Sequence, residues 1–371
     1  MPFPVRGTAA EPFAVVVDAL AGLPSDPGAQ LVVHHHGRRV VDAWSPAAGD
    51  GDALTGVYSA GKAAAYLVAA ALVADGVLEL DRRVVEYWPE FTLPALTLTD
   101  LLAHRSGLIG VHGGFTPAEL ADDRLLAARL LHQEPFWRPG SAYGYHAFTI
   151  GALLNEVVTR ATGRTTKQLF TDLIGTPDVF LGTPDESRYR PLLPPPQKIR
   201  IPPGSLTEIA FNLNAAPPTD MISWINTPSV RAAGPLSGGA VASARGLASM
   251  YAAALWGASP PPGSSSPARP FVDRHTLADF AQISSDGFDR VTGERRHFGL
   301  GFEVQHLRYP GLSPSAFGHS GASGTHALAD PDHGLVFAYT RRTCAYPTGA
   351  APEVPALLNA VLRAAGPVPT R

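Results

Sequence analysis

The feature that most constrains this chain is the way its strand-like and helix-like segments are distributed. Residues 30–45 contain two apolar runs around Gly37, a pattern typical of two short strands joined by a tight turn. Strand signals return only after residue 296, in the segments HFGLGFEVQHL, GTHALADP and GLVFAYTRR. Between residues 56 and 290 the pattern is mainly helical. Strands from the two ends must therefore meet in space if they are to form one sheet.

This distribution predicts an α/β fold of the α+β type, in which an antiparallel sheet from N- and C-terminal strands is flanked by terminal helices. We expect one domain spanning residues 1–371. Its α/β lobe would comprise residues 1–55 plus 291–371, and an inserted, mainly helical lobe would comprise residues 56–290. Ligands commonly bind between lobes, so we expect the active site in the cleft between these two.

A lysine at the head of an apolar helix is the first sign of chemistry. The segment VYSAGKAAAYLVAAALVADG (57–76) is almost entirely alanine, leucine and valine, yet it begins with Ser59 and Lys62. A buried amine is costly unless it is paired or used. Residues i and i+3 share a helix face, so the two side chains can meet, and an amine with a lowered pKa can take the proton of a serine nucleophile. On this motif alone, a capping serine beside a solvent-reaching lysine is an equal alternative.

Two further stretches carry residue types suited to the same chemistry. Tyr145 lies in a loop that enters a helix, in the segment WRPGSAYGYHAFTIG, and a tyrosine near a cation can act in acid–base catalysis. His319, Ser320 and Gly321 open a strand predicted in FGHSGASGTHALADP, where glycine lets a backbone N–H approach a ligand. Ser323 in the same segment does not complete a G-x-S-x-G nucleophile elbow, because the final glycine is missing.

Composition argues against several other classes of function. The net charge of −3 gives no reason to expect nucleic acid or a membrane as partner. The single cysteine, Cys344, rules out an intramolecular disulfide and fits a reducing compartment. The N-terminus has no signal-peptide pattern, so we expect a cytoplasmic protein. No phosphate loop, zinc spacing or calcium loop is found, so we expect no cofactor and no metal. The sequence leaves the oligomeric state open.

Taken together, the S-x-x-K pair, the tyrosine before a helix and the H-x-G triplet resemble the serine β-lactamase and penicillin-binding protein superfamily. Their order and spacing are similar to the branch that holds class C β-lactamases, D-Ala-D-Ala carboxypeptidases, family VIII carboxylesterases and related acyltransferases. The resemblance covers nearly the whole chain, including DGVLELDRRVVEYWPEF (75–91) and LLAHRSGL (101–108). The β-lactamase-like fold that it implies agrees with the architecture expected above.

The resemblance also implies a role for each residue. Ser59 would be the nucleophile, and Lys62 the general base or its proton partner. Tyr145 would activate the nucleophile or water and protonate the leaving group. The backbone N–H groups of Ser59 and Ala322 would form the oxyanion hole. The residues expected to bind the oxyanion or the substrate are Ala322, His319, Ser320, Gly321 and His146.

Two departures from the family pattern bear on the substrate. The usual Y-x-N motif is Tyr145-His146-Ala147 here, so the asparagine amide is absent. H-S-G stands in place of K-T-G, so the titratable imidazole of His319 replaces a permanent cation that would bind a carboxylate. Both changes favour an acyl donor without an obligatory carboxylate.

The sequence therefore predicts a serine hydrolase that cleaves a small-molecule ester, in the manner of a carboxylesterase, through a Ser59 acyl-enzyme. The alternative is a transacylase that passes the acyl group to an amine or alcohol in a natural-product pathway. Lesser alternatives are a β-lactamase or D-Ala-D-Ala peptidase, and a non-catalytic binding protein. His104, Trp137 and Trp224 are assigned to packing rather than to chemistry.

Overall fold

A large sheet joins the two ends of the chain. The computed structural model describes residues 2–367 apart from 177, 198–199 and 258–269. Within them, seven strands form an antiparallel sheet in the order β1-β3-β2-β10-β9-β8-β7. These strands are β1 Arg6–Ala9, β2 Ala29–His35, β3 Arg38–Trp44, β7 Glu303–Val304, β8 Phe317–Ser320, β9 His326–Asp330 and β10 Leu335–Arg341. The expected sheet from N- and C-terminal strands is thus confirmed.

The rest of the regular structure is helical, apart from a small second sheet in the order β4-β6-β5. That sheet consists of β4 Thr55–Gly56, β5 Val179–Phe180 and β6 Val241–Ala242. The helices are α1 Ala14–Ala21, α2 Lys62–Ala74, α3 Leu98–Leu102, α4 Pro117–Leu120, α5 Asp123–Leu130, α6 Ile150–Thr162, α7 Thr166–Leu173, α8 Leu206–Ala210, α9 Met221–Asn226, α10 Pro228–Ala233, α11 Ala244–Trp256, α12 Arg274–Ala281 and α13 Val354–Ala365. None of these described helices is long and apolar enough to cross a membrane.

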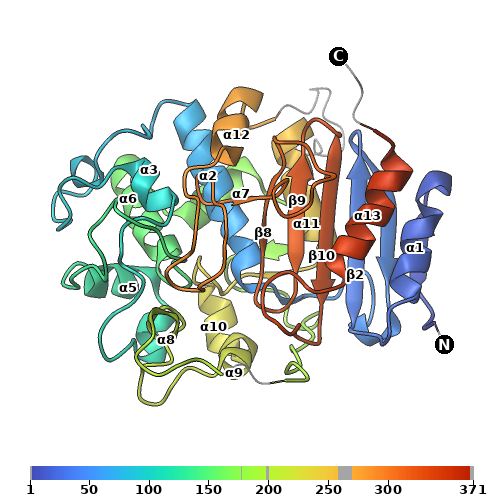
Figure 1. Ribbon diagram of the computed structural model, residues 1–371, viewed down its shortest axis with the longest axis horizontal. Coiled ribbons are helices and arrows are strands. Elements are labelled where there is room, and N and C mark those ends of the chain that lie inside the picture. The colour runs from blue at the N-terminus through green and yellow to red at the C-terminus, as the bar shows by residue number, and fades with distance from the viewer. Residues whose placement is uncertain (1, 177, 198–199, 258–269, 368–371) are drawn as a thin grey trace.

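The large sheet is apolar on both faces because side chains alternate along its strands. In β10, Leu335 and Phe337 belong to the core formed with α1 and α13. Their neighbours Val336 and Ala338 belong to the core formed with the helices of the other layer. Figure 1 shows α1 and α13 together on the right of the sheet and α3, α5 and α6 gathered on the left. The sheet therefore lies between two layers of helix.

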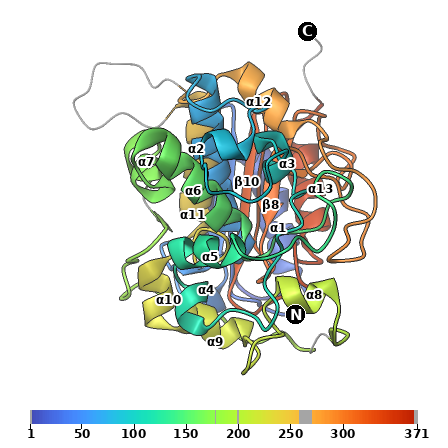
Figure 2. The same ribbon diagram turned by 90° about the vertical axis from the view of Figure 1, so that its left-hand side faces the viewer.

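Helix α2 connects these parts through the middle of the molecule. Every residue from Lys62 to Leu72 is buried. Of the eight residues Ala63–Ala70, all except Tyr66 are alanine, leucine or valine, which allows close packing on several sides. The helix contacts α6 and α7 in the helical part, α12, and strand β8 of the large sheet. Figure 2 shows it in front of the sheet strands, next to α6. A residue at the start of α2 is consequently held against both the helical part and the sheet.

Two details differ from the sequence prediction. The triplet His319-Ser320-Gly321 lies at the end of β8 rather than opening a strand, because the chain turns at Gly321, whose N–H donates to the carbonyl of Thr325 at 2.8 Å. Helix α11 falls within the range 56–290 assigned to the helical lobe, yet it packs on β2, β9 and β10. For the two-lobe division we therefore propose a boundary that leaves α11 with the sheet.

Candidate active site

The turn that carries Ser59 is held in an unusual backbone conformation. Tyr58 has φ = +46°, in the left-handed region, and its hydroxyl donates to the carbonyl of Met221 at 2.8 Å. The Val57 N–H donates to the carbonyl of Ala240 at 3.0 Å. A short 3₁₀ turn, Tyr58–Gly61, then leads directly into α2. The surrounding contacts thus fix Ser59 at the head of the helix, where its side chain is only partly buried.

The contact expected between Ser59 and Lys62 is present. Lys62 Nζ lies 2.9 Å from Ser59 Oγ and 2.8 Å from the carbonyl oxygen of Ala147, and it also bonds the carbonyl oxygen of Ser237. A neutral amine has two N–H groups and one lone pair. If the two carbonyls accept the N–H groups, the lone pair is left for the Ser59 hydroxyl proton. The surroundings of Lys62 therefore suit a free base.

The electrostatic surroundings of Lys62 favour the same state. The side chain is 1% exposed. Burial lowers its pKa well below the usual value, and the positive charge of Arg296 lowers it further, while Glu303 opposes the shift. Because desolvation is the largest of these effects, the shift follows from the apolar environment of α2 itself.

Tyr145 lies beside this pair, in the loop before α6. Its ring is stacked on Phe298, with centroids 5.9 Å apart and planes 12° apart, and Lys62 Nζ lies 5.1 Å from the ring centroid. Its backbone N–H donates to Asp289 Oδ1 at 3.0 Å. Burial raises the pKa of the phenol, and the Ser59 hydroxyl and Arg296 oppose that rise. The phenol is therefore protonated at neutral pH and can donate a proton.

The hydroxyl of Tyr145 is buried and has no partner in full hydrogen-bond geometry among the described residues. A buried unpaired hydroxyl is destabilising, so folding alone gives no reason to have one here. It faces the group that would attack a substrate, which is where a proton donor for a leaving group is needed.

The end of β8 approaches the Ser59 turn very closely. A Cβ on Gly321 would lie 2.1 Å from the carbonyl oxygen of Val57 and 3.3 Å from the nitrogen of Ala60, so only glycine fits. The next residue, Ala322, is partly exposed, like Ser59. This close approach brings the backbone around Ala322 to the turn that carries Ser59.

His319 lies behind this junction and is 1% exposed. Its Nδ1 is 2.7 Å from the carbonyl oxygen of Ser320, so the proton belongs on Nδ1 and Nε2 is the free lone pair. Burial lowers the pKa of His319 to about 4; Glu303 opposes the shift and Lys62 adds to it. The imidazole is therefore neutral at neutral pH, unlike the lysine of the K-T-G motif that it replaces.

The structure does not support the expected substrate contact of His146. This side chain is fully buried, with Nε2 2.6 Å from Ser106 Oγ and Nδ1 2.7 Å from the carbonyl oxygen of Gly144. Both ring nitrogens are thus occupied inside the protein. His104 accepts from the His146 N–H at 3.2 Å and has φ = +61°. The two histidines contact the Tyr145 loop from inside the protein, which is consistent with a structural role.

Sequence reasoning missed two charged residues at the site, Arg296 and Glu303. The Arg296 guanidinium lies 5.2 Å from the Tyr145 ring centroid and forms an ion pair with Glu303. Glu303 Oε1 also accepts from Ser320 Oγ at 2.7 Å. The segment ERRHFGLGFE contains both residues, but no motif or helical spacing relates them. They meet because the chain folds back between Phe298 and Glu303 before β7.

The other residues considered from sequence are structural. Ser323 is buried and shares a hydrogen bond of 2.9 Å with Thr325. Trp137 and Trp224 are each 6% exposed and belong to the main core. Cys344 is buried.

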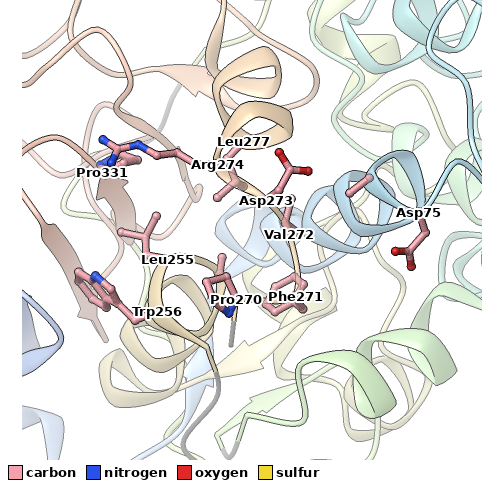
Figure 3. Close-up of a pocket in the computed structure, with 12 residues that line it drawn as sticks. Asp75, Leu255, Trp256, Pro270, Phe271, Val272, Asp273, Arg274, Leu277 and Pro331 are labelled. Atoms are coloured by element: carbon pink, nitrogen blue, oxygen red, sulfur yellow. The ribbon is translucent and has the colours of Figure 1, made fainter. Parts of the chain in front are cut away.

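A separate cavity of about 620 Å³ lies at the far end of α2 (Figure 3). Asp75, Trp256, Phe271 and Arg274 are among the residues that line it. Since α2 rises about 1.5 Å per residue, this cavity is roughly 20 Å from Ser59. It is distinct from the cluster around Ser59.

A candidate nucleophile, a candidate base and a candidate acid thus converge where α2, the Tyr145 loop and β8 meet. Residues 17–348 match the model of the Beta-lactamase family, and the chain belongs to that family.

The individual relatives that it resembles include esterases. EstA from Arthrobacter nitroguajacolicus Rue61a is 36% identical, with a TM-score of 0.86 over 98% of this chain and 99% of that chain. A family VIII carboxylesterase is 27% identical, with a TM-score of 0.85 over 98% of this chain and 100% of that chain. Esterase/beta-lactamase LipL of Mycobacterium tuberculosis (strain ATCC 25618 / H37Rv) is 28% identical and covers 90% of this chain and 82% of its own length.

Proposed function

We propose that this protein is a serine esterase that cleaves a small ester through an acyl-enzyme on Ser59. The observation that carries the proposal is the position of Lys62 Nζ, 2.9 Å from Ser59 Oγ, with two carbonyl oxygens as its remaining partners. A lysine in this setting can act as the base that takes the proton of the Ser59 hydroxyl. The esterase names of relatives that match nearly the whole chain support the same reaction class.

In this mechanism Lys62 takes the Ser59 proton as Oγ bonds the ester carbonyl carbon. The resulting oxyanion would be held by the backbone N–H groups of Ser59 and Ala322. Collapse of the tetrahedral intermediate breaks the bond to the alkoxy oxygen, which leaves as an alcohol with the proton of Tyr145. The proton on Lys62 then returns Tyr145 to its neutral form. Water, deprotonated by the same groups, attacks the acyl-enzyme and releases the acid.

The residues at the two positions that depart from the family motifs, Ala147 and His319, favour esters over β-lactams. Ala147 offers only a methyl group in place of the side-chain amide that β-lactamases place after this tyrosine. His319 is neutral, with a pKa lowered to about 4, and so provides no permanent cation for a carboxylate. The name of LipL joins esterase and β-lactamase, so slow β-lactam hydrolysis is an expected side reaction.

The same acyl-enzyme could pass its acyl group to an amine or an alcohol. Nothing about Ser59, Lys62 or Tyr145 distinguishes this transacylation from hydrolysis, because the two reactions differ only in the second nucleophile. Product analysis distinguishes them: with a p-nitrophenyl ester and an added amine, an esterase yields mainly free acid, whereas a transacylase yields mainly amide.

The test of the proposal is intact-protein mass spectrometry after mixing with p-nitrophenyl butyrate, with Ser59→Ala beside the wild type. We expect an acyl adduct and a burst of p-nitrophenol on the wild type alone. Full turnover by Ser59→Ala would exclude Ser59 as the nucleophile. Absence of both adduct and turnover in the wild type would exclude esterase activity on short acyl chains.

A further inference from the structure

The Arg296 guanidinium lies beside the Tyr145 ring and is not fully buried. Its side chain is 17% exposed, and its guanidinium lies over the rings of Tyr145 and Phe298, at 5.2 and 5.0 Å from their centroids. A guanidinium in this position would attract a carboxylate on a substrate bound at Ser59. Without a neighbouring anion, Arg296 would supply the positive charge that the K-T-G motif carries on its lysine and that His319 lacks.

Glu303 cancels that charge. Its side chain is 7% exposed and forms an ion pair with Arg296. Burial opposes ionisation of Glu303, but the charge of Arg296 outweighs it and holds the pKa of the carboxyl well below its usual range. The carboxylate is therefore present at neutral pH, and the pair has no net charge.

Glu303 also occupies the neighbouring hydrogen-bond donor. The hydroxyl of Ser320 donates to Glu303 Oε1 at 2.7 Å. The N–H of His319 donates to the carbonyl of Ser320 at 2.7 Å, which leaves only the lone pair of Nε2, and that atom has no partner among the described residues. The cation and the hydroxyl that could pair with a substrate carboxylate are thus both occupied by Glu303, and the buried His319 ring offers no donor.

We propose that Glu303 is a specificity-determining residue, which cancels the charge of Arg296 and occupies Ser320 so that the site selects acyl donors without a carboxylate near the reacting carbonyl. This inference rests on the proposed esterase function. It adds that the preference for neutral donors is imposed by an acidic residue, and is not only the result of a missing lysine. Removing the carboxylate should therefore create a new activity.

The test compares two substrates of equal chain length, p-nitrophenyl hexanoate and mono-p-nitrophenyl adipate, which differ by a terminal carboxylate. The quantity measured is the ratio of kcat/KM for adipate to that for hexanoate at pH 8. In Glu303→Gln the uncompensated Arg296 should raise this ratio about tenfold, as expected for one unit charge acting over several ångströms. In Arg296→Gln the buried Glu303 carboxyl loses the cation that keeps it ionised, so no net charge is added and the ratio should stay within about threefold of wild type. The double variant should return to within about threefold of wild type.

A purely structural role predicts a different result. Both single variants would then lose activity on both substrates, with the ratio unchanged, and the proposal would be overturned. Asp42→Asn is the matched control, since Asp42 is a carboxylate of 9% exposure paired with Arg245 at 3.0 Å in a different part of the fold, and its ratio should match wild type.

Two outcomes separate this inference from the proposed function. If wild type shows no Ser59-dependent turnover of hexanoate, the esterase proposal fails and this inference fails with it. If turnover depends on Ser59 but the ratio does not move with Glu303, only this inference fails. Should Glu303→Gln not fold, Glu303→Met decides, because it also leaves Arg296 uncompensated and its ratio must rise above that of wild type.

Discussion

Removing the hydroxyl of Tyr145 should leave the fold intact and the chemistry disabled. In most proteins, replacing a buried tyrosine by phenylalanine loses a hydrogen bond and costs stability. Here the ring is 5% exposed and stacked on Phe298, and its hydroxyl has no partner in full hydrogen-bond geometry among the described residues. Tyr145→Phe keeps the stacking and removes a buried oxygen that interacts with the Ser59 hydroxyl but has no hydrogen bond in full geometry among the described residues.

The magnitudes follow from these two facts. An unsatisfied buried polar group costs about 1–3 kcal/mol, so the free energy of unfolding of Tyr145→Phe should be unchanged or higher by about 1 kcal/mol. Positioned acid–base groups contribute about 10²–10⁴ in rate, so kcat/KM should fall by that factor, which corresponds to about 3–5 kcal/mol of transition-state stabilisation.

The assay is hydrolysis of p-nitrophenyl butyrate together with urea unfolding of the same preparations. Tyr66→Phe is the matched control. Tyr66 lies on α2, its side chain is buried like that of Tyr145, and its hydroxyl has no hydrogen-bond partner among the described residues. Its activity should stay within about threefold of wild type. Near-normal turnover by Tyr145→Phe would refute its role as proton donor, and a loss of stability above about 1 kcal/mol would show that the hydroxyl is bonded in the folded state.

Three further predictions concern Lys62 and Gly321. Because burial lowers the pKa of Lys62, kcat/KM should stay high well below pH 10.5 and fall only as pH drops through the lowered pKa; an acid limb near 10.5 would contradict this. The unfolded chain keeps this proton to higher pH, so the stability of wild type relative to Lys62→Met should rise between pH 7 and 10, as measured by urea unfolding. Gly321→Ala places a Cβ 2.1 Å from the Val57 carbonyl oxygen. This clash should lower Tm by a few degrees and slow acylation of Ser59. An unchanged Tm would contradict the close approach of the two backbone segments.

The architecture could be predicted from sequence because its signals are local. Short apolar runs along β2, β3 and β10 and a helical period in the middle are enough to indicate a sheet made from both ends. The spacing of Ser59 and Lys62 sets their contact directly, since helix geometry brings i and i+3 together. Strand β1, Arg6–Ala9, escaped prediction because it is short, at the sheet edge and mostly exposed.

The electrostatic surroundings of the site could not be predicted in the same way. Arg296 and Glu303 are seven residues apart in a segment without regular period, and only the fold-back before β7 pairs them. His146 adjoins Tyr145 in sequence, but the loop turns its ring away toward Ser106. Which way a loop side chain points depends on what packs behind it, and that information is spread over the whole chain. The catalytic roles of Ser59, Lys62 and Tyr145 stay predictions until they are tested.

The pairing of β2 with β10 has a consequence for how the protein is made. Val33 pairs with Phe337, so the centre of the sheet joins segments from opposite ends of the chain. At about 5–20 residues per second, a ribosome needs on the order of 15–60 s to synthesise the roughly 300 residues between them. During that time β2 has an unpaired edge and α2 has no sheet to pack on. Folding is therefore dominated by late, long-range contacts, and the nascent chain is exposed to aggregation until its last strands emerge.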